Sequence, residues 1–392
     1  MAAELPTVRV SRKGASRFAS GHPWIFAADV VDRGVAGPGD AVRVIDPNGR
    51  FLGVAHHSST SQICLRLLSD RLQTIDKDFF LGRIRAADSF RQRVVSNTDA
   101  YRVVFGEADL LPGLVIDRYA EFVVMQTLDQ GMDRAAGLIA ECIGELFCPA
   151  AVVIRNDAAV RSRESLPLEK RVLSGELPDR VRLSMNGIAF EADLLGGQKT
   201  GMYLDQRENY LAAARYSHGR ALDCFASTGG FALHLASRCE RVIAVDSSES
   251  ALAGARRNAE LNGISNIEFR AANVFDFLAA QDRAHERFDA IVLDPPAFTK
   301  SRSAIEGAAR GYKDINLRAL RLLAPGGVLL TCSCSQHVSE AMLLEIVASA
   351  ALDAGRTLRV LERRTQAADH PILLTVPETH YLKCLILQVV DV

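Results

Sequence analysis

Two thiols and a carboxylate carry the most evident chemistry in this 392-residue chain. Cys332 and Cys334 lie two positions apart at the end of the apolar run in "LLTCSCSQHV", and Asp294 ends the run "FDAIVLD" just before two prolines. A cysteine thiolate is a strong nucleophile, and a carboxylate beside it can hold or protonate the group under attack. The three side chains favour covalent catalysis, provided that the two runs are neighbouring strands.

The two runs belong to a regular alternation of strands and helices that begins at Gly219. Short apolar segments such as "RVIAVD" are followed by amphipathic helices such as "SESALAGARRNAELNG". A parallel sheet covered on both faces requires this pattern, so residues 181–392 are predicted to form a doubly wound, Rossmann-like α/β domain. The last two strands, "TLRVLERR" and "YLKCLILQVV", have only a loop between them, which predicts an antiparallel hairpin at the sheet edge.

Two smaller domains are predicted before this one. Residues 1–71 contain short alternating segments separated by turn formers, which is typical of a β-rich module. Residues 72–180 begin with a helix from Leu72 to about Phe90 and continue with strands, the helix "GMDRAAGLIAECIGELF" and a further strand, which indicates an α+β unit. The polar stretch 162–180 is interpreted as a linker.

Composition places the chain among folded globular proteins. It is 48% hydrophobic and 24% charged, and no stretch approaches the roughly 20 apolar residues of a membrane span. The first residues lack the apolar core of a signal peptide, and the eight cysteines show neither disulfide spacing nor a C-x-x-C pair. We therefore expect a cytoplasmic protein with free thiols, no membrane contact and no metal.

The loop "DCFASTGGFALHLA", after the first strand of the α/β domain, is a candidate cofactor site. Gly229 and Gly230 permit a tight turn, but the G-x-G-x-x-G spacing of dinucleotide folds is missing. Asp246 closes the second strand, where it can accept both ribose hydroxyls, and Asp223 can face a cationic group. S-adenosylmethionine combines adenosine with a sulfonium and uses both carboxylates. Either aspartate alone could equally be a helix N-cap.

Methyl transfer gives the thiols a role. Carbon 5 of cytosine is a poor nucleophile until a thiolate adds to carbon 6, after which it can attack the sulfonium methyl group. Cys334 is followed by a polar turn and is favoured as the nucleophile, whereas Cys332 is better explained as a small apolar core residue. His337 and His370 are candidate proton carriers, Asn273 could accept the adenine amino group through its side-chain oxygen, and Phe298 could stack on a base.

Several longer motifs carry a family resemblance across nearly the whole chain. They are, in order, "KGASRFASGHPWIF", "GEADLLPGLVIDRY", "GGQKTGMYLDQREN", "DPPAFTKSRS", "TCSCS" and "AADHP". Together they resemble the bacterial large-subunit (23S) ribosomal RNA cytosine-C5 methyltransferases that carry an N-terminal PUA domain. The resemblance implies a PUA-like RNA-binding domain over 1–71, a central domain over 72–180, a methyltransferase domain over 181–392, and 5-methylcytosine in large-subunit ribosomal RNA as the product.

The resemblance also implies site residues. Cys334 would be the nucleophile, with Asp294 beside it, and basic side chains would contact RNA despite a net charge of −1. The candidate RNA contacts are Arg12, Lys13, Arg17, Lys300 and Arg302. The candidate cofactor contacts are Lys199, Thr200, Asp223, Phe225, Ser227, Gly229, Asp246, Ser247, Asn273 and Asp294.

The chain departs from the family pattern at two places. Relatives commonly have an acid where Asn273 stands, and many RNA cytosine-C5 methyltransferases have a second cysteine after the prolines, where this chain has Ala297.

Two other functions remain open. An RNA guanine N-methyltransferase would use the same D-P-P segment without a covalent step, and a non-catalytic RNA-binding factor in ribosome assembly could retain a cofactor fold. The sequence also leaves open the target nucleotide, naked RNA or a ribosomal particle as substrate, and the acceptor of the C5 proton. Spacing alone does not decide between Cys332 and Cys334 as the nucleophile, and the oligomeric state is open, with a homodimer as one alternative.

Overall fold

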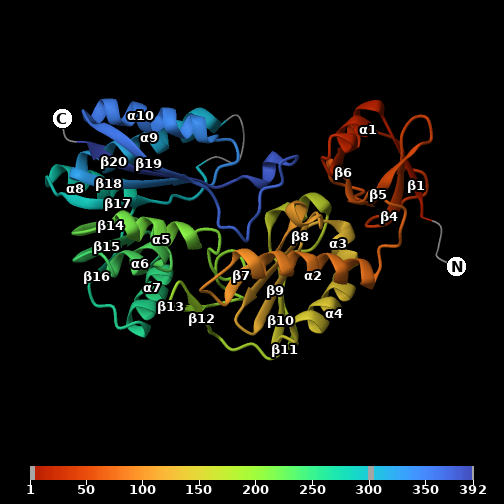
Figure 1. Cartoon of the computed structure of the whole chain (residues 1–392), viewed down its shortest axis with the longest axis horizontal. Coiled ribbons are helices and arrows are strands. Elements are labelled where there is room, and N and C mark those ends of the chain that lie inside the picture. Colours follow the sequence, from red (N-terminus) through yellow and green to blue (C-terminus); the bar gives the residue numbers. More distant parts are fainter. Residues whose placement is uncertain (1–4, 299–303, 391–392) are drawn as a thin grey trace. The chain divides into compact units, whose positions relative to one another are not determined.

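The computed structural model describes residues 5–298 and 304–390, so the predicted RNA contacts Lys300 and Arg302 lie outside the described residues. The chain divides into two compact units (Figure 1). The first consists of Met1–Leu183, Ala192–Met202 and Ala368–Thr379, and the second of Ser184–Glu191, Tyr203–Ala367 and His380–Val392. Each unit therefore contains segments that are distant in sequence.

The N-terminal part of the first unit is the predicted β-rich module. Its sheet has the order β2-β6-β5-β4-β1-β3, in which β1 pairs with β4 in parallel and the other neighbours are antiparallel. Val8, Val44 and Leu65 lie in its buried core. Helix α1 (Arg12–Ala19) begins at Ser11, whose Oγ accepts the backbone N–H of Gly14 at 3.1 Å. The strands are β1 (Thr7–Val10), β2 (Trp24–Phe26), β3 (Val30–Asp32), β4 (Ala41–Ile45), β5 (Phe51–His57) and β6 (Ile63–Ser69).

The rest of the first unit is the predicted α+β domain. Its sheet has the order β11-β10-β9-β8-β7, with β9 and β10 parallel and the helices α3 and α4 between them in sequence. The elements are α2 (Lys77–Val94), β7 (Ala100–Phe105), β8 (Leu114–Tyr119), β9 (Phe122–Thr127), α3 (Gln130–Arg134), α4 (Ala136–Phe147), β10 (Ala151–Asn156) and β11 (Glu169–Gly175).

The interpretation of 162–180 as a linker is wrong. Residues Glu169–Gly175 form β11, which pairs antiparallel with β10 at the edge of the sheet. An edge strand needs only one partner and tolerates polar residues on both faces. The half-exposed sequence "EKRVLSG" therefore lacks the apolar alternation by which a strand is recognised.

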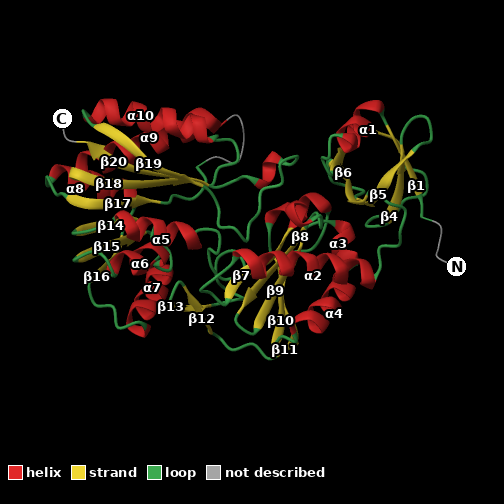
Figure 2. Cartoon of the chain, viewed as in Figure 1, coloured by secondary structure: helices red, strands yellow, loops and turns green. Residues whose placement is uncertain are grey.

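The second unit has the predicted Rossmann-like architecture, with helices on both faces of the sheet (Figure 2). Strands β14, β15, β16, β17 and β18 are parallel in the order β16-β15-β14-β17-β18, and β20 pairs antiparallel with both β18 and β19, which confirms the terminal hairpin. The strands are β14 (Arg220–Cys224), β15 (Arg241–Asp246), β16 (Ile267–Ala271), β17 (Phe288–Leu293), β18 (Leu323–Ser333), β19 (Thr357–Arg364) and β20 (Lys383–Val390).

The helices of this unit pack in two groups. Helix α6 contacts α5 and α7, while α9 contacts α8 and α10. The two layers bury the apolar strands between them, as a doubly wound sheet requires. The helices are α5 (Arg207–Tyr216), α6 (Gly230–Ala236), α7 (Glu249–Leu261), α8 (Val274–Arg283), α9 (Ile305–Leu322) and α10 (Glu340–Ala354).

A short two-stranded sheet before α5 in the chain was missed from the sequence. It consists of β12 (Val181–Met185) and β13 (Ile188–Ala192), joined by Asn186 and Gly187, both with positive φ. An Asn-Gly pair between alternating residues is a strong hairpin signal. The dipeptide was therefore the signal that could have revealed it.

In residues 5–298 and 304–390, no helix has the length and apolarity to cross a bilayer. No group of three or more His, Cys, Asp or Glu side chains in these residues is arranged to hold a metal ion.

Candidate active site

The candidate site is built at the carboxyl ends of four neighbouring parallel strands of the second unit. Asp223 lies in β14, Asp246 ends β15, Asp294 directly follows β17 and Cys334 directly follows β18. Because these strands are adjacent and parallel, their carboxyl ends meet at one edge of the sheet. The sequence prediction that the thiol segment neighbours the D-P-P segment is confirmed.

The loop after β14 has an unusual backbone. Phe225 and Ser227 have positive φ values of 66° and 48°, and Gly229, at the start of α6, has a φ of 87°. The next glycine, Gly230, packs so closely on Tyr210 that an added Cβ would lie 2.4 Å from the ring. Non-glycine residues in the left-handed region are held there by their surroundings and occur preferentially at ligand sites.

Asp223 is fully buried, and only one of its two carboxylate oxygens accepts a hydrogen bond from the described residues. Its Oδ2 accepts the backbone N–H of Ala232 at 2.9 Å, whereas Oδ1 has no hydrogen-bond partner among the described residues. Burial raises the pKa of Asp223 well above its usual range, and the nearby Asp294 and Asp246 act in the same direction. A buried acceptor without a partner is what a hydroxyl or ammonium group of a bound cofactor would satisfy.

Asp246 is oriented by the two loops beside it. Its Oδ2 accepts the backbone N–H of Ser227 at 2.9 Å, and Oδ1 accepts that of Ser248 at 2.8 Å. One backbone donor on each oxygen leaves further lone pairs on the carboxylate, which suits the two hydroxyls of a ribose. Ser247, which lies between Asp246 and Ser248 in sequence, is exposed.

Asn273 caps the helix that follows β16. Its Oδ1 accepts the backbone N–H groups of Phe275 at 2.9 Å and Asp276 at 3.4 Å, at the start of α8. The oxygen that we expected to receive the adenine amino group is therefore engaged in the cap, and a contact between Asn273 and adenine stays a prediction.

Lys199 and Thr200 belong to the first unit. Thr200 is 1% exposed, donates its hydroxyl to Asp117 Oδ2 at 2.6 Å and lies 2.9 Å from the hydroxyl of Tyr119. Its side chain thus completes a polar network of the central domain. Lys199 has a positive φ of 52°. The roles implied for both residues at the cofactor also remain predictions.

Cys334 is partly buried and is held next to the D-P-P segment. Its Sγ lies 4.0 Å from the carbonyl oxygen of Pro295. The residues on either side are fixed by one hydroxyl, since Tyr312 Oη lies 2.9 Å from Ser333 Oγ and 3.1 Å from Ser335 Oγ. The thiol therefore has a defined place beside Pro295, the residue after Asp294.

Cys332 lies in a different environment. It is fully buried and lies opposite Cys384 of β20 in the register of the sheet. Burial raises the pKa of the Cys332 thiol well above its usual range, so the thiol stays protonated and unreactive. The prediction that Cys332 is a core residue is confirmed, which leaves Cys334 as the candidate nucleophile of the pair.

His370 and Phe298 have structural contacts, and His337 lies near the thiol in sequence. His370 belongs to the first unit, where it is buried and its Nδ1 lies 3.1 Å from Asp369 Oδ1. Phe298 packs on the rings of Phe275 and Tyr312, with centroid separations of 5.9 and 4.6 Å. His337, in the turn after Cys334, is partly buried.

The structure adds Lys383, which the sequence interpretation missed. It is the first residue of β20, is 3% exposed and lies opposite Ser333 in the register with β18. The signal was present in "YLKCLILQVV", because a lysine at the start of a buried apolar strand requires an explanation.

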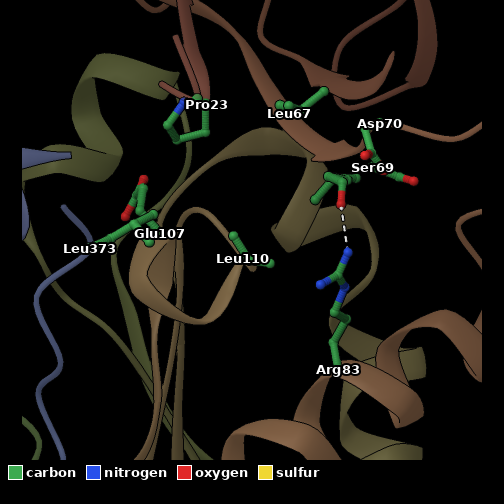
Figure 3. A pocket seen from close by; sticks show the side chains of 10 residues that line it. Pro23, Leu67, Ser69, Asp70, Arg83, Glu107, Leu110 and Leu373 are labelled. Carbon is green, nitrogen blue, oxygen red and sulfur yellow. Dashed lines mark hydrogen bonds between the residues drawn. The ribbon is translucent and has the colours of Figure 1, made fainter. Parts of the chain in front are cut away.

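Two adjacent hollows lie on the first unit. Lys13 and Arg17 of α1 line an open one of about 300 Å³, whereas Arg12 is exposed elsewhere on the same helix. The second, of about 250 Å³, is lined by residues of the N-terminal module and the central domain, among them Pro23, Arg83 and Glu107 (Figure 3). The same two segments alternate between the hollows: Ser20, His22 and Thr375 line the first, and Gly21, Pro23 and Leu373 line the second.

Comparisons with known proteins agree with this architecture. A PUA-like domain model matches residues 8–70, and an S-adenosylmethionine-dependent methyltransferase model matches residues 159–387. The protein named ribosomal RNA large subunit methyltransferase I of Klebsiella pneumoniae is 43% identical over 371 residues, which cover 92% of this chain and 93% of that protein. Its namesake in Aeromonas salmonicida is 43% identical over 377 residues, covering 94% and 95%.

The chain belongs to this methyltransferase family. Solved structures support the fold. The crystal structure of SMU.776 complexed with SAH superposes with a TM-score of 0.85, covering 97% of this chain and 99% of that one at 18% identity. Trm5b from Pyrococcus abyssi superposes with a TM-score of 0.53, covering 70% and 75% at 16% identity.

The cofactor of the family is S-adenosylmethionine, and the residues of the second unit fit it. The buried free oxygen of Asp223 suits a cationic amine or a hydroxyl group, and the oriented carboxylate of Asp246 suits a ribose. The turn from Phe225 to Gly229 lets the backbone approach a ligand closely. The family's cofactor therefore matches the donors and acceptors at this edge of the sheet.

Proposed function

We propose that this methyltransferase acts on large-subunit ribosomal RNA and forms 5-methylcytosine through a covalent adduct between Cys334 and carbon 6 of the target base. The substrate class is supported by the names of the relatives that are 43% identical over more than nine-tenths of the chain. The observation that carries the chemistry is the contrast between a sealed thiol at 332 and a partly exposed thiol at 334, beside Pro295.

In the proposed reaction, the cofactor, Cys334 and Asp294 have different roles. S-adenosylmethionine supplies an electrophilic methyl group on a positively charged sulfur. The thiolate of Cys334 adds to C6 of cytosine, which moves an electron pair into the ring and makes C5 nucleophilic enough to take that methyl group. Asp294 holds the N3/N4 edge of the ring and, as the protonated acid, gives N3 the proton that neutralises the negative charge developing there. A base then takes the C5 proton, the C6–S bond breaks so that the thiolate leaves, and N3 returns its proton to Asp294, which restores the aromatic ring.

Basic side chains hold the RNA in this proposal. Lys13 and Arg17 line the same hollow, and Arg12 lies on the same helix, so the three can contact successive phosphates. Lys300 and Arg302, six and eight positions after Asp294 in sequence, are proposed to contact RNA near the target base. The base itself must be turned out of its stack to reach the half-buried thiol.

A matched pair of variants tests the proposed function. Cys334→Ala should abolish methyl transfer from labelled S-adenosylmethionine to large-subunit RNA, while Cys332→Ala should retain it. RNA containing 5-fluorocytosine should trap a covalent complex with the wild-type protein and with Cys332→Ala, because fluorine at C5 cannot leave as a proton.

Normal methylation by Cys334→Ala would contradict the covalent mechanism and would favour transfer to a ring nitrogen. Product analysis would then decide between 5-methylcytosine and a methylated guanine. The absence of transfer to both naked RNA and subunit precursors would favour a role in ribosome assembly without catalysis.

A further inference from the structure

Lys383 is a buried cation beside the proposed nucleophile. Its Nζ donates to the carbonyl oxygen of Ser335 at 2.6 Å and to that of Tyr381 at 2.9 Å. Ser335 is the residue directly after Cys334, and Lys383 itself pairs in register with Ser333, the residue directly before it. The ammonium group is therefore fixed to the short segment that carries the thiol.

In the part of the chain that the structure describes, no carboxylate forms an ion pair with the Lys383 ammonium, whereas the half-exposed Lys313 pairs with Asp353 at 2.7 Å. Two neutral carbonyl groups satisfy hydrogen bonds but do not neutralise a charge. A buried charge without a counter-ion is unfavourable unless a neighbouring group ionises to balance it.

Cys334 is the ionisable side chain of the segment to which the ammonium is fixed, so it is the candidate to balance the charge. Burial lowers the pKa of Lys383 to about 8, and the charge of Cys334 acts in the opposite direction. Tyr203, before α5, and Tyr312 of α9 also interact electrostatically with Cys334, and burial raises the pKa of both, so they stay neutral. Asp294 directly precedes the Pro295 contact, and a carboxylate there would repel a thiolate when ionised, so it offers Cys334 no counter-charge.

We propose that Lys383 is a positioning residue that keeps Cys334 ionised. The proton on Sγ moves to a neutral Nζ, so that one S–H bond breaks, one N–H bond forms, and a thiol and an amine become an ion pair. The inference rests on the proposed function for the choice of Cys334 as nucleophile. The same ammonium stabilises the thiolate again when it leaves C6 at the end of the reaction.

The test measures the pH dependence of Cys334 alkylation by iodoacetamide, followed site by site with mass spectrometry and without RNA. In the wild-type protein the midpoint should lie below the ordinary cysteine value of about 8.5. Lys383→Met, which has a similar length and no charge, should raise the midpoint by about one unit, equivalent to about tenfold slower alkylation at pH 7. Lys383→Arg keeps the positive charge and should retain the low midpoint.

Three controls separate ionisation from misfolding. Exposed Cys148 should keep the same profile in every variant, and fully buried Cys332 should react only if the protein unfolds. Lys313→Met removes a half-exposed lysine of the same unit, paired with Asp353, and should change nothing at Cys334. An unchanged Cys334 midpoint in folded Lys383→Met would overturn the proposal. A Lys383-dependent midpoint together with full methylation by Cys334→Ala would support the ion pair and contradict the proposed function.

Discussion

The two units of this protein differ in the partners of their buried charged side chains. In the first unit, buried Arg91 bonds both oxygens of Asp109, and Arg102 bonds both oxygens of Asp117. At the sheet edge of the second unit, Asp223 has one buried oxygen without a partner in the described residues, and Lys383 has carbonyl groups in place of an acid. We call a buried charge matched when an oppositely charged side chain pairs with it. Matched charges contribute to the fold, whereas unmatched buried charges are more often found at ligand-binding or catalytic sites.

The largest effect should follow from breaking a matched pair in the first unit. Arg91→Met leaves Asp109 half-buried without its cation and removes the donor to the carbonyl oxygen of Asp369, at 2.8 Å. We expect a loss of about 3–5 kcal/mol in the free energy of unfolding. The single tryptophan, Trp24, lies in this unit, so its fluorescence during urea unfolding reports the change.

The matched control for Arg91 is an exposed arginine. Arg256→Met breaks the surface pair with Glu249, which should cost no more than about 1 kcal/mol. Equal effects of the two substitutions would show that burial of the Arg91 pair does not matter to the fold.

A second prediction concerns His234, which lies in α6 below the cofactor loop. It is 3% exposed, its Nδ1 lies 2.7 Å from Gly230 O, and burial lowers its pKa from 6.5 to about 4. As pH falls below 6.5 the unfolded chain binds a proton that the folded chain excludes, so the second unit should lose about 3 kcal/mol of stability by pH 4. His234→Gln should flatten this slope, as measured by hydrogen exchange of β14 and β15, while exposed His218→Gln should leave it unchanged.

A third prediction concerns Asp223, the unmatched acid. Asp223→Asn keeps the shape but removes the charge, and a hydrogen bond to a charged group contributes about 1.5–3 kcal/mol, so the affinity for S-adenosylmethionine should fall about 10- to 100-fold. The pKa of Asp223 is raised in the folded protein, so ionisation at neutral pH opposes folding, and the variant without cofactor should melt at a higher temperature than the wild type.

Calorimetric titration and thermal melting of the cofactor-free protein measure the two effects of Asp223→Asn. The control is Asp353→Asn, an exposed acid of the same unit whose loss should alter neither. A variant that melts lower and binds the cofactor normally would place Asp223 among the matched, structural charges.

The comparison also shows what the sequence could and could not predict. The carboxyl ends of β14, β15, β17 and β18 were predicted to meet. Short apolar strands that alternate with amphipathic helices can be recognised locally in the sequence, and this alternation is typical of the doubly wound sheet. The partner of each polar side chain depends on contacts between distant segments. Arg91 and Asp369 are 278 positions apart, and nothing in the motif "AADHP" reveals that it packs in the first unit.

Thr200 and Lys383 illustrate the same limit in opposite directions. Thr200 stands in a motif that implied a cofactor contact, yet its hydroxyl is used by Asp117. Lys383 stands in a predicted strand, but its importance became visible only when the register placed it opposite Ser333. Residue type and spacing thus located the reacting groups, and only the tertiary contacts showed which charges are matched.

The smallest effect is expected where charges are exposed to solvent. Lys13→Gln combined with Arg17→Gln removes two cations from the hollow beside α1, and each should contribute one unit to the salt dependence of RNA binding. We expect the slope of log K against log salt to decrease by about 2, with a loss of affinity that shrinks as salt rises. Fluorescence anisotropy with a large-subunit RNA fragment measures both quantities.

The control for this surface is the pair Lys170→Gln and Arg171→Gln, which removes the same charge from exposed positions of β11. If RNA approaches through the hollow, the control should retain most of the wild-type slope, because condensed counterions are released only where a cation contacts a phosphate. Equal slopes for the two double variants would mean that the RNA responds to total charge, and the distinction between a structural and a ligand-binding region would then hold for buried charges alone.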